Sequence, residues 1–237
     1  MHRALSFAAA LGLATLPLAA QALQPFSAQY TADWQQVPVS GSAERVLQQA
    51  DGVWSLQFRA SMLVAGISEE SRFRHENGRF VPISYRFERN GLGKRKQIAH
   101  DFDWQGQQVS GHDRGNKVSL VLKSGLLDKS TYQLALQEDV AAGRKGMSYQ
   151  VLDGDEIETY DFRVLGSETV QTEAGQVEAV KVERVRDPTQ SNRKTVLWFA
   201  RDWDYLLVRL HQVEKDGKEY QIMLKQGTVG GRTVQGR

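Results

Sequence analysis

Residues 194–226, KTVLWFARDWDYLLVRLHQVEKDGKEYQIMLKQ, have the pattern of a turn-rich strand followed by a β-hairpin. Apolar residues recur at every second position before and after a turn that contains Asp216 and Gly217. A two-residue turn would place the two apolar rows on opposite faces of the hairpin. A three-residue loop at 215–217 instead pairs Leu210 with Ile222, as in a type I turn with a glycine bulge. The stretch therefore predicts a hairpin with one apolar face.

The same alternation occurs upstream, around a turn at Asp51 and Gly52. A strand at 39–48 leads into this turn, and every second residue of 54–62 is apolar and mostly bulky. A two-residue turn pairs Leu47 with Leu56, which places both apolar rows on one face. Because turn chemistry and pattern agree, this stretch also predicts a hairpin.

Turn signals separate similar short segments along most of the chain, which is typical of a meander. Further strands are expected at 26–35, 67–75, 81–87, 94–104, around 109, 118–122, 148–152, 156–165, 168–172 and 177–185. One segment breaks the two-residue period, because apolar residues recur every four positions between Asp128 and Ala142. This spacing predicts an amphipathic helix at about 129–142, with Asp128 capping its N-terminus and Gly143 ending it.

These patterns predict a mainly β protein. We expect an antiparallel meander forming a curved sheet or open β-barrel, built as one domain over 23–226. Its two β halves, about 23–122 and 148–226, are joined by the helix. The tail at 227–237 has almost no apolar residues, so we expect it to be disordered.

Residues 1–22 have the features of a secretory signal peptide. Arg3 supplies a positive charge, a short apolar run follows, and Ala20 and Ala22 form a small-x-small cleavage site. The run is shorter than the roughly 20 residues that a membrane span needs. No cysteine follows the site, which excludes a lipoprotein anchor. We expect a periplasmic protein that starts near Leu23 and has no transmembrane segment after cleavage.

The amino-acid composition excludes several other classes of protein and of functional site. The 30 basic and 28 acidic residues nearly balance, whereas a nucleic-acid-binding protein carries a clustered basic excess. The absence of cysteine excludes disulfides, thiolate catalysis and cysteine metal sites. An exported chain of this kind must be stabilised by its apolar core.

Two stretches of the second half resemble a known family. They are TEAGQVEAVKVERVRD at 172–187 and TVLWFARDWDYLLVRLHQ at 195–212, and they are similar to domain-of-unknown-function family 3108, a group of exported bacterial proteins. The opening strand FSAQYTADW and the stretch FVPISYRFERNG at 80–91 fit as well. Leu207 departs from the family, whose members often have proline there. The resemblance implies a curved antiparallel sheet or open barrel, like envelope lipid carriers, and it brings no catalytic residue.

The sequence offers little for catalysis or metal binding. No histidine lies in a recognised nucleophile motif. In the expected register His112 shares a face with Asp101 and Asp103, while His100 points to the opposite face. No HExxH or similar spacing accompanies these residues, so we interpret them as a solvated polar face. We expect no enzymatic activity, no metal and no cofactor.

A basic cluster flanks the predicted turn at Asn90 and Gly91. Its members are Arg86, Arg89, Lys94, Arg95 and Lys96. Such a cluster can dock anionic headgroups of the envelope. The alternative, which we prefer, is a charged hairpin tip that discourages edge-to-edge pairing.

Bulky side chains on several strands are expected to share one face of the sheet. They are Trp34, Trp54, Phe58, Met62, Tyr85, Phe87, Phe102 and Trp104. In a closed and filled barrel these residues form the core. In an open barrel one helix covers only part of the face, and the rest is an apolar cleft that suits an acyl chain.

Three functions remain in view. The first is non-enzymatic binding of a lipophilic or envelope-derived ligand in the concave apolar face. The alternative is an envelope scaffolding module that holds another protein through sheet edges and the basic hairpin. A hydrolase that uses His100 and His112 comes third.

Overall fold

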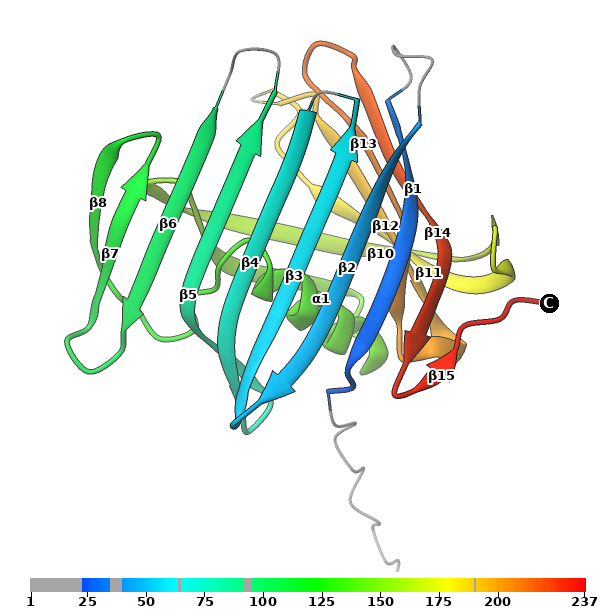
Figure 1. Ribbon diagram of the computed structural model, residues 1–237, viewed down its shortest axis with the longest axis horizontal. Coiled ribbons are helices and arrows are strands. Elements are labelled where there is room, and N and C mark those ends of the chain that lie inside the picture. The colour runs from blue at the N-terminus through cyan, green and yellow to red at the C-terminus, as the bar shows by residue number, and fades with distance from the viewer. Residues whose placement is uncertain (1–22, 35–39, 64, 92–94, 190) are drawn as a thin grey trace, which may run out of the picture.

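The computed structural model describes residues 23–34, 40–63, 65–91, 95–189 and 191–237 (Figure 1). The side chain of Trp34 lies outside the described residues. In chain order the elements are β1 (Phe26–Trp34), β2 (Gly41–Ala50), β3 (Val53–Met62), β4 (Ala65–Glu76), β5 (Arg79–Asn90), β6 (Lys96–Asp103), β7 (Gln108–Asp113), β8 (Asn116–Val121), α1 (Thr131–Ala141), β9 (Gly146–Asp153), β10 (Glu156–Thr172), β11 (Gly175–Val185), β12 (Lys194–Ala200), a 3-10 turn (Arg201–Trp203), β13 (Leu206–Val213), β14 (Glu219–Val229) and β15 (Arg232–Thr233).

The strands form one antiparallel sheet that curves around α1 (Figure 1). Their order is β8-β7-β6-β5-β4-β3-β2-β1-β14-β13-β12-β11-β10-β9, with β15 added beside β14. The first strand of the chain, β1, and one of the last, β14, therefore pair with each other in the middle of the sheet. The edge strands β8 and β9 do not pair with each other in the part of the chain that is described, so the sheet is not closed into a barrel.

The predicted fold class is confirmed, and so are both predicted hairpins. Leu47 pairs with Leu56 across a turn whose two central residues, Asp51 and Gly52, have positive φ values of 51° and 76°. Leu210 pairs with Ile222. The loop at 215–217 is closed by a 2.8 Å hydrogen bond from the Glu214 amide to the Lys218 carbonyl, which is the three-residue loop that alternation favoured.

The helix also lies where the sequence places it. Ser130 is the residue before the first turn, but the capping oxygen comes from Asp128, whose Oδ1 accepts hydrogen bonds of 2.8 Å from the Ser130 and Thr131 amides. These bonds satisfy donors that a helix N-terminus leaves free. At the other end Gly143 has a φ of 79°, and its amide donates to the Val140 carbonyl.

The helix packs into the concave face and joins the two halves. Leu134 lies in a cluster with side chains of β1, β2, β3 and β14, and Leu136 and Val140 lie in a second cluster with side chains of β9 to β13. Both leucines are 0% exposed. Complete burial of one leucine stabilises a fold by about 1.5–3 kcal/mol. The helix is therefore a central part of the core and not a cover laid on it.

The two edges of the sheet approach each other through side chains. A third cluster joins Tyr85 and Phe102 of the first half to Leu152 of β9. Leu127, in the segment after β8, forms a single parallel bridge with Val151. These contacts hold the open sheet in a barrel-like curve.

The prediction of a disordered tail is wrong. Residues up to Val229 belong to β14, and β15 turns back to pair with it. Val234 is 3% exposed, and its amide donates to the Gly227 carbonyl at 2.8 Å. The Arg237 carbonyl accepts from the Gln176 amide at 3.0 Å. Backbone hydrogen bonds to β14 and β11 order this segment, and such bonds leave little trace in amino-acid composition.

The strands predicted at 156–165 and 168–172 are one long strand, β10, with a register shift between Val164 and Gly166. The predicted signal peptide at 1–22 lies outside the described residues and stays a prediction. Within the described chain, no helix is long and apolar enough to cross a membrane.

Candidate functional site

Side chains on the inner face of the sheet become more exposed toward one end of the strands. On β3, Trp54 and Leu56 are buried, whereas Phe58, Ala60 and Met62 on the same face are only half-buried. Alternate residues of a strand point to the same side. The inner face is therefore packed at the start of β3 and open at its end.

The opposite wall shows the same change. Leu207 of β13 is buried, whereas Leu210, which lies in the same cluster beyond a register shift, is half-buried. On β14, Leu224 is 0% exposed and Ile222 is half-buried. Because β13 runs antiparallel to β14, both changes occur at the same end of the molecule.

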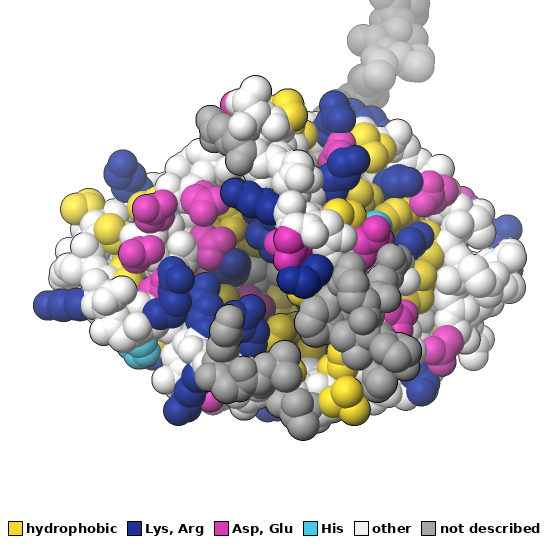
Figure 2. All heavy atoms as spheres, turned by 90° about the horizontal axis from the view of Figure 1, so that it is seen from above, with side chains coloured by type: hydrophobic (Ala, Val, Ile, Leu, Met, Phe, Trp, Pro, Cys, Tyr) yellow, Lys and Arg dark blue, Asp and Glu magenta, His cyan; other side chains and the backbone are white. Residues whose placement is uncertain are grey.

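Figure 2 looks onto this end and shows a depression in the middle of the molecule, with hydrophobic, basic and acidic side chains around it. We call this space the hollow. Its apolar walls are formed by the half-buried inner residues Phe58, Ala60, Met62, Ile67, Phe87, Leu210 and Ile222. Strands of the two halves, far apart in the sequence, thus contribute to a single apolar lining.

Tyr132, in the first turn of α1, lies beneath the hollow among aromatic rings. Its ring centroid is 5.1 Å from that of Tyr160, in an edge-on arrangement, and 5.8 Å from that of Phe162. The Arg184 guanidinium carbon lies 3.2 Å from the Tyr160 ring centroid. Burial raises the pKa of Tyr132 to about 12, so this hydroxyl stays neutral at every physiological pH.

The start of α1 is fixed to the sheet by buried polar contacts. The Ser71 hydroxyl donates to Asp128 at 2.6 Å, and the Ser130 hydroxyl donates to Glu69 at 2.8 Å. Burial raises the pKa of Asp128 to about 6, although the hydrogen bonds from Ser71, Thr131 and Ser130 oppose that rise. These contacts hold Tyr132 in place below the hollow.

Arginines of β11 and the segment after it form the basic side of the hollow. Arg184 pairs with Phe162, an inner-face residue of β10, and Arg186 is two positions further along the same face. Arg186 donates to the Thr195 hydroxyl at 3.2 Å and to the Arg193 carbonyl at 3.3 Å. Burial, with repulsion from Arg184 and Arg193, lowers the pKa of Arg186 to about 10.

The structure places the predicted lining residues at two depths. Trp54, Tyr85 and Phe102 are buried in the packed core, so the prediction that they line a cleft is wrong for these three. Leu134 of α1 lies in the cluster that buries Trp54, whereas Leu126 of the segment after β8 and Leu152 of β9 lie in the cluster that buries Tyr85 and Phe102. Phe58 and Phe87 face the hollow, and they share one inner row through Glu69.

The remaining predicted lining residues differ among themselves. Met62 is half-buried at the open end of β3. The Trp104 ring nitrogen donates to the Pro82 carbonyl at 2.6 Å, in the third cluster and away from the hollow. The side chain of Trp34 lies outside the described residues.

The predicted basic cluster is divided between two faces. Arg86 forms a 2.5 Å ion pair with Asp101 on the outer face, and Arg95 pairs with Glu88 at 2.9 Å. Arg89 and Lys96 are paired in register on the inner row, and the Lys96 ammonium lies 6.0 Å from the centroid of the Phe87 ring. Lys94 lies outside the described residues. The described members of the cluster therefore do not share one face, since alternation sends neighbouring residues of a strand to opposite faces.

The histidines are separated as the register predicted. His112 pairs with Ala99 and is exposed on the outer face, while His100 is 0% exposed and stacks on Tyr85 at 5.7 Å. Burial lowers the pKa of His100. Over the described ranges, no three His, Asp or Glu side chains are grouped in a way that would hold a metal ion.

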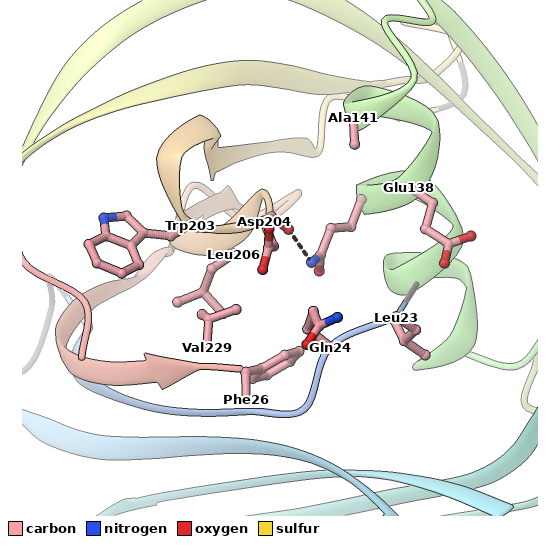
Figure 3. A pocket seen from close by; sticks show the side chains of 10 residues that line it. Leu23, Gln24, Phe26, Glu138, Ala141, Trp203, Asp204, Leu206 and Val229 are labelled. Atoms are coloured by element: carbon pink, nitrogen blue, oxygen red, sulfur yellow. Dashed lines mark hydrogen bonds between the residues drawn. The ribbon is translucent and has the colours of Figure 1, made fainter. Parts of the chain in front are cut away.

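A small cavity lies at the other end of the molecule (Figure 3). Its volume is about 40 Å³, and its walls include Phe26, Glu138 and Trp203. The Gln137 side chain, also part of the walls, donates to the Asp204 carbonyl at 2.8 Å. A cavity of this size holds about three water molecules, so it is too small for an organic ligand.

Sequence reasoning missed the arginines of the inner face. Arg45 lies between Ala43 and Leu47 in an otherwise apolar row of β2, and Arg184 and Arg186 continue the row that contains Val182. A charged residue at an apolar position of an alternating strand is the signal that marks them.

Comparisons with known proteins agree with this architecture. The family described as "Protein of unknown function (DUF3108)" matches residues 29–225. Among solved structures, a β-barrel-like protein of domain of unknown function DUF1849 from Brucella abortus is similar, with a TM-score of 0.57 and 13% sequence identity. The match covers 87% of this chain and 98% of that one, and at this identity it shows the fold alone. The search of curated proteins gave no match. With most of its length matched, the chain belongs to the DUF3108 family.

Proposed function

We propose that this protein binds a lipophilic ligand in the hollow and carries out no chemistry on it. The observation that carries the proposal is the change in burial along the inner rows. The same rows that are packed around α1 present half-buried apolar side chains at the open end, among them Phe58, Ile67 and Ile222. A concave apolar site with a few polar groups is the usual form of a small-molecule site.

The dimensions of the hollow suit an alkyl chain. The apolar row of β3 runs from Phe58 to Met62, and four residues of strand span about 13 Å. The facing row of β14 and β13 contributes Ile222 and Leu210. An acyl chain that enters between these walls would exchange water contacts for apolar contacts along its length.

The place of action that we propose is the periplasm. The support is the signal-like sequence at 1–22, with its basic residue, short apolar run and small-x-small site. A carrier in that compartment would hold lipophilic or envelope-derived molecules in water between membranes.

A displacement experiment tests the proposal. An apolar fluorescent dye is bound to the protein and displaced with medium-chain lipids. Ala60→Trp places an indole in the hollow and is expected to lower dye and lipid affinity at least tenfold. Arg59→Trp adds the same ring on the exposed outer face of β3 and serves as the matched control. Equal binding by both variants, with both folded, would refute the proposal.

A second candidate function is a scaffold for another envelope protein. It is favoured by β8, an edge strand that pairs with β7, and whose Val121 is 69% exposed. An exposed strand edge can accept a strand from a partner. Cross-linking in cells separates the two functions. A single stoichiometric partner, lost in Arg86→Glu with Arg95→Glu, would favour the scaffold.

A further inference from the structure

Arg45 is a buried charge in an apolar row. It is 3% exposed and faces inward between Ala43 and Leu47. Its partners across the strands are Ala28, whose small side chain leaves room for the guanidinium, and Phe58. The guanidinium carbon lies 5.6 Å from the Phe26 ring centroid, and the group also contacts the Tyr30 hydroxyl. Its Nη2 is buried, and no hydrogen-bond partner for it is present among the described residues. A buried cation is costly unless it is paired, so its retention here requires an explanation.

Arg184 and Arg186 add two more cations to the same interior. The buried Nε of Arg184 has no hydrogen-bond partner in the described chain, and its Nη2 lies 3.4 Å from the half-exposed carboxylate of Glu158. The hydrogen bonds of Arg186 go to a hydroxyl and a carbonyl oxygen, which are neutral acceptors. The two guanidinium groups repel each other, and an anion placed between them would relieve that repulsion.

The positive charges come from both walls of the molecule and converge on Tyr132. The charges of Arg184 on β11 and of Arg45 on β2 both act on the Tyr132 hydroxyl. Two acids, Glu69 and Asp153, act on it in the opposite direction. Glu69 accepts from Ser130, and Asp153 pairs with Lys129 at 2.7 Å and accepts from Tyr160. Both acids thus have partners of their own, while donors of Arg45 and Arg184 remain unused.

We infer that the ligand of the hollow is an amphiphile with an oxyanion headgroup, a carboxylate or a phosphate, held by Arg184 and Arg186. Its alkyl chain lies against the apolar walls, and Arg45 strengthens the positive field from beyond Tyr132 without touching the ligand. The planar guanidinium fork matches both kinds of oxyanion in two-bond geometry. This inference rests on the proposed function, because it describes the ligand of the same hollow.

The test compares ligands that share a chain and differ in headgroup. Decanoate, decyl phosphate and decanol each displace the apolar dye from the full-length mature protein at fixed low salt. The wild type is expected to bind at least one of the anions tenfold or more tightly than decanol. The better of the two anions identifies the headgroup. In Arg184→Gln with Arg186→Gln, this preference is expected to fall below threefold while decanol affinity changes less than twofold.

Matched variants separate recognition from folding. Arg59→Gln with Arg163→Gln removes the same charge from the outer face and should keep the anion preference. Arg184→Lys with Arg186→Lys keeps the charge without the fork, and it should retain part of the preference. Loss of decanol and anion binding to the same extent in the glutamine variant would mean a structural role, and it would overturn the inference.

Arg45→Met gives an independent readout. Removing an incompletely paired buried charge should leave the melting temperature of the ligand-free protein equal to or above that of the wild type. The same change should reduce the anion preference two- to fourfold. A lower melting temperature with an unchanged preference would show that Arg45 is structural.

The outcomes distinguish this inference from the function on which it rests. Equal binding of all three ligands by the wild type would overturn the oxyanion headgroup and leave lipophilic binding standing. Failure of every ligand, decanol included, to displace the dye would overturn the proposed function, and the inference with it.

Discussion

Asp128 shows how one residue links the helix to the sheet. Its Oδ1 caps the first turn of α1, and its Oδ2 accepts from Ser71 of β4. The carboxyl group is fully buried, and burial raises its pKa to about 6. Because the pKa of this carboxyl group differs between the folded and unfolded states, the stability of the fold depends on pH.

The sign of that dependence follows from proton binding. The folded-state pKa of Asp128 lies above its ordinary value of 3.8, so the folded protein binds this proton more tightly than the unfolded chain. The stability that the protonated Asp128 carboxyl contributes to the fold is therefore complete below about pH 4 and is lost as pH rises through 6. Asp128→Asn should remove this pH-dependent contribution.

The measurement is urea unfolding of the wild type and Asp128→Asn at several pH values. Between pH 4 and pH 7 the stability difference between wild type and variant should shift by roughly 2–3 kcal/mol against the wild type. A difference that stays constant over this window would contradict the buried position of the carboxylate.

Gly111 marks a close approach between two strands. A Cβ added there would lie 1.9 Å from the Ala99 carbonyl oxygen, which no real contact permits. We expect Gly111→Ala to lower the free energy of unfolding by about 2–4 kcal/mol through strand displacement. Gly146→Ala is the control, because nothing lies within 4 Å of a Cβ at that position. Similar stability of the two variants in denaturant unfolding would show that β6 and β7 are not paired as described.

At the scale of elements, α1 has the largest effect on the core. Leu136 is 0% exposed and packs with Met147, Phe162 and Leu197 of the second half. Leu136→Ala should cost about 2–5 kcal/mol of unfolding free energy, because it removes buried contacts and leaves a cavity. Gln133→Ala, on the half-buried side of the same helix, should change stability by less than about 1 kcal/mol. Equal effects in chemical unfolding would mean that α1 does not enter the core.

The C-terminal strand provides a second test at this scale. Val234 is buried and Thr233 beside it is exposed. Val234→Asp should lower the melting temperature by several degrees, since a buried unpaired carboxylate is costly, and Thr233→Asp should change it little. If neither substitution has an effect in thermal unfolding, the segment after β14 is not held to the sheet.

At the scale of the whole molecule, alternation made most of the fold predictable. Rows such as Trp54, Leu56 and Phe58 fixed which face of each strand is inside, and the turn at Asp51 and Gly52 fixed the register. The helix was visible because its apolar spacing changed. The order of the tail was not predictable, because its bonds to Gln176 and Gly227 join backbone groups.

The candidate site could be predicted from the sequence less well than the fold could. Alternation identifies the inner face of a strand, but it does not say how deep along that face the packing extends. Trp54 and Phe58 belong to one row, and only the position of α1 decides that the first is core while the second faces the hollow. Arg45 and Arg184 lie more than a hundred residues apart, so their convergence on Tyr132 depends on the curvature of the whole sheet.

The central claim is that the hollow holds one lipophilic molecule, and native mass spectrometry of protein purified without detergent tests it most directly. After incubation with decanoate, the wild type is predicted to show a one-to-one complex, and Ala60→Trp is predicted to show none. A spectrum with only the ligand-free mass for the wild type, or with the same complex in both proteins, would contradict it.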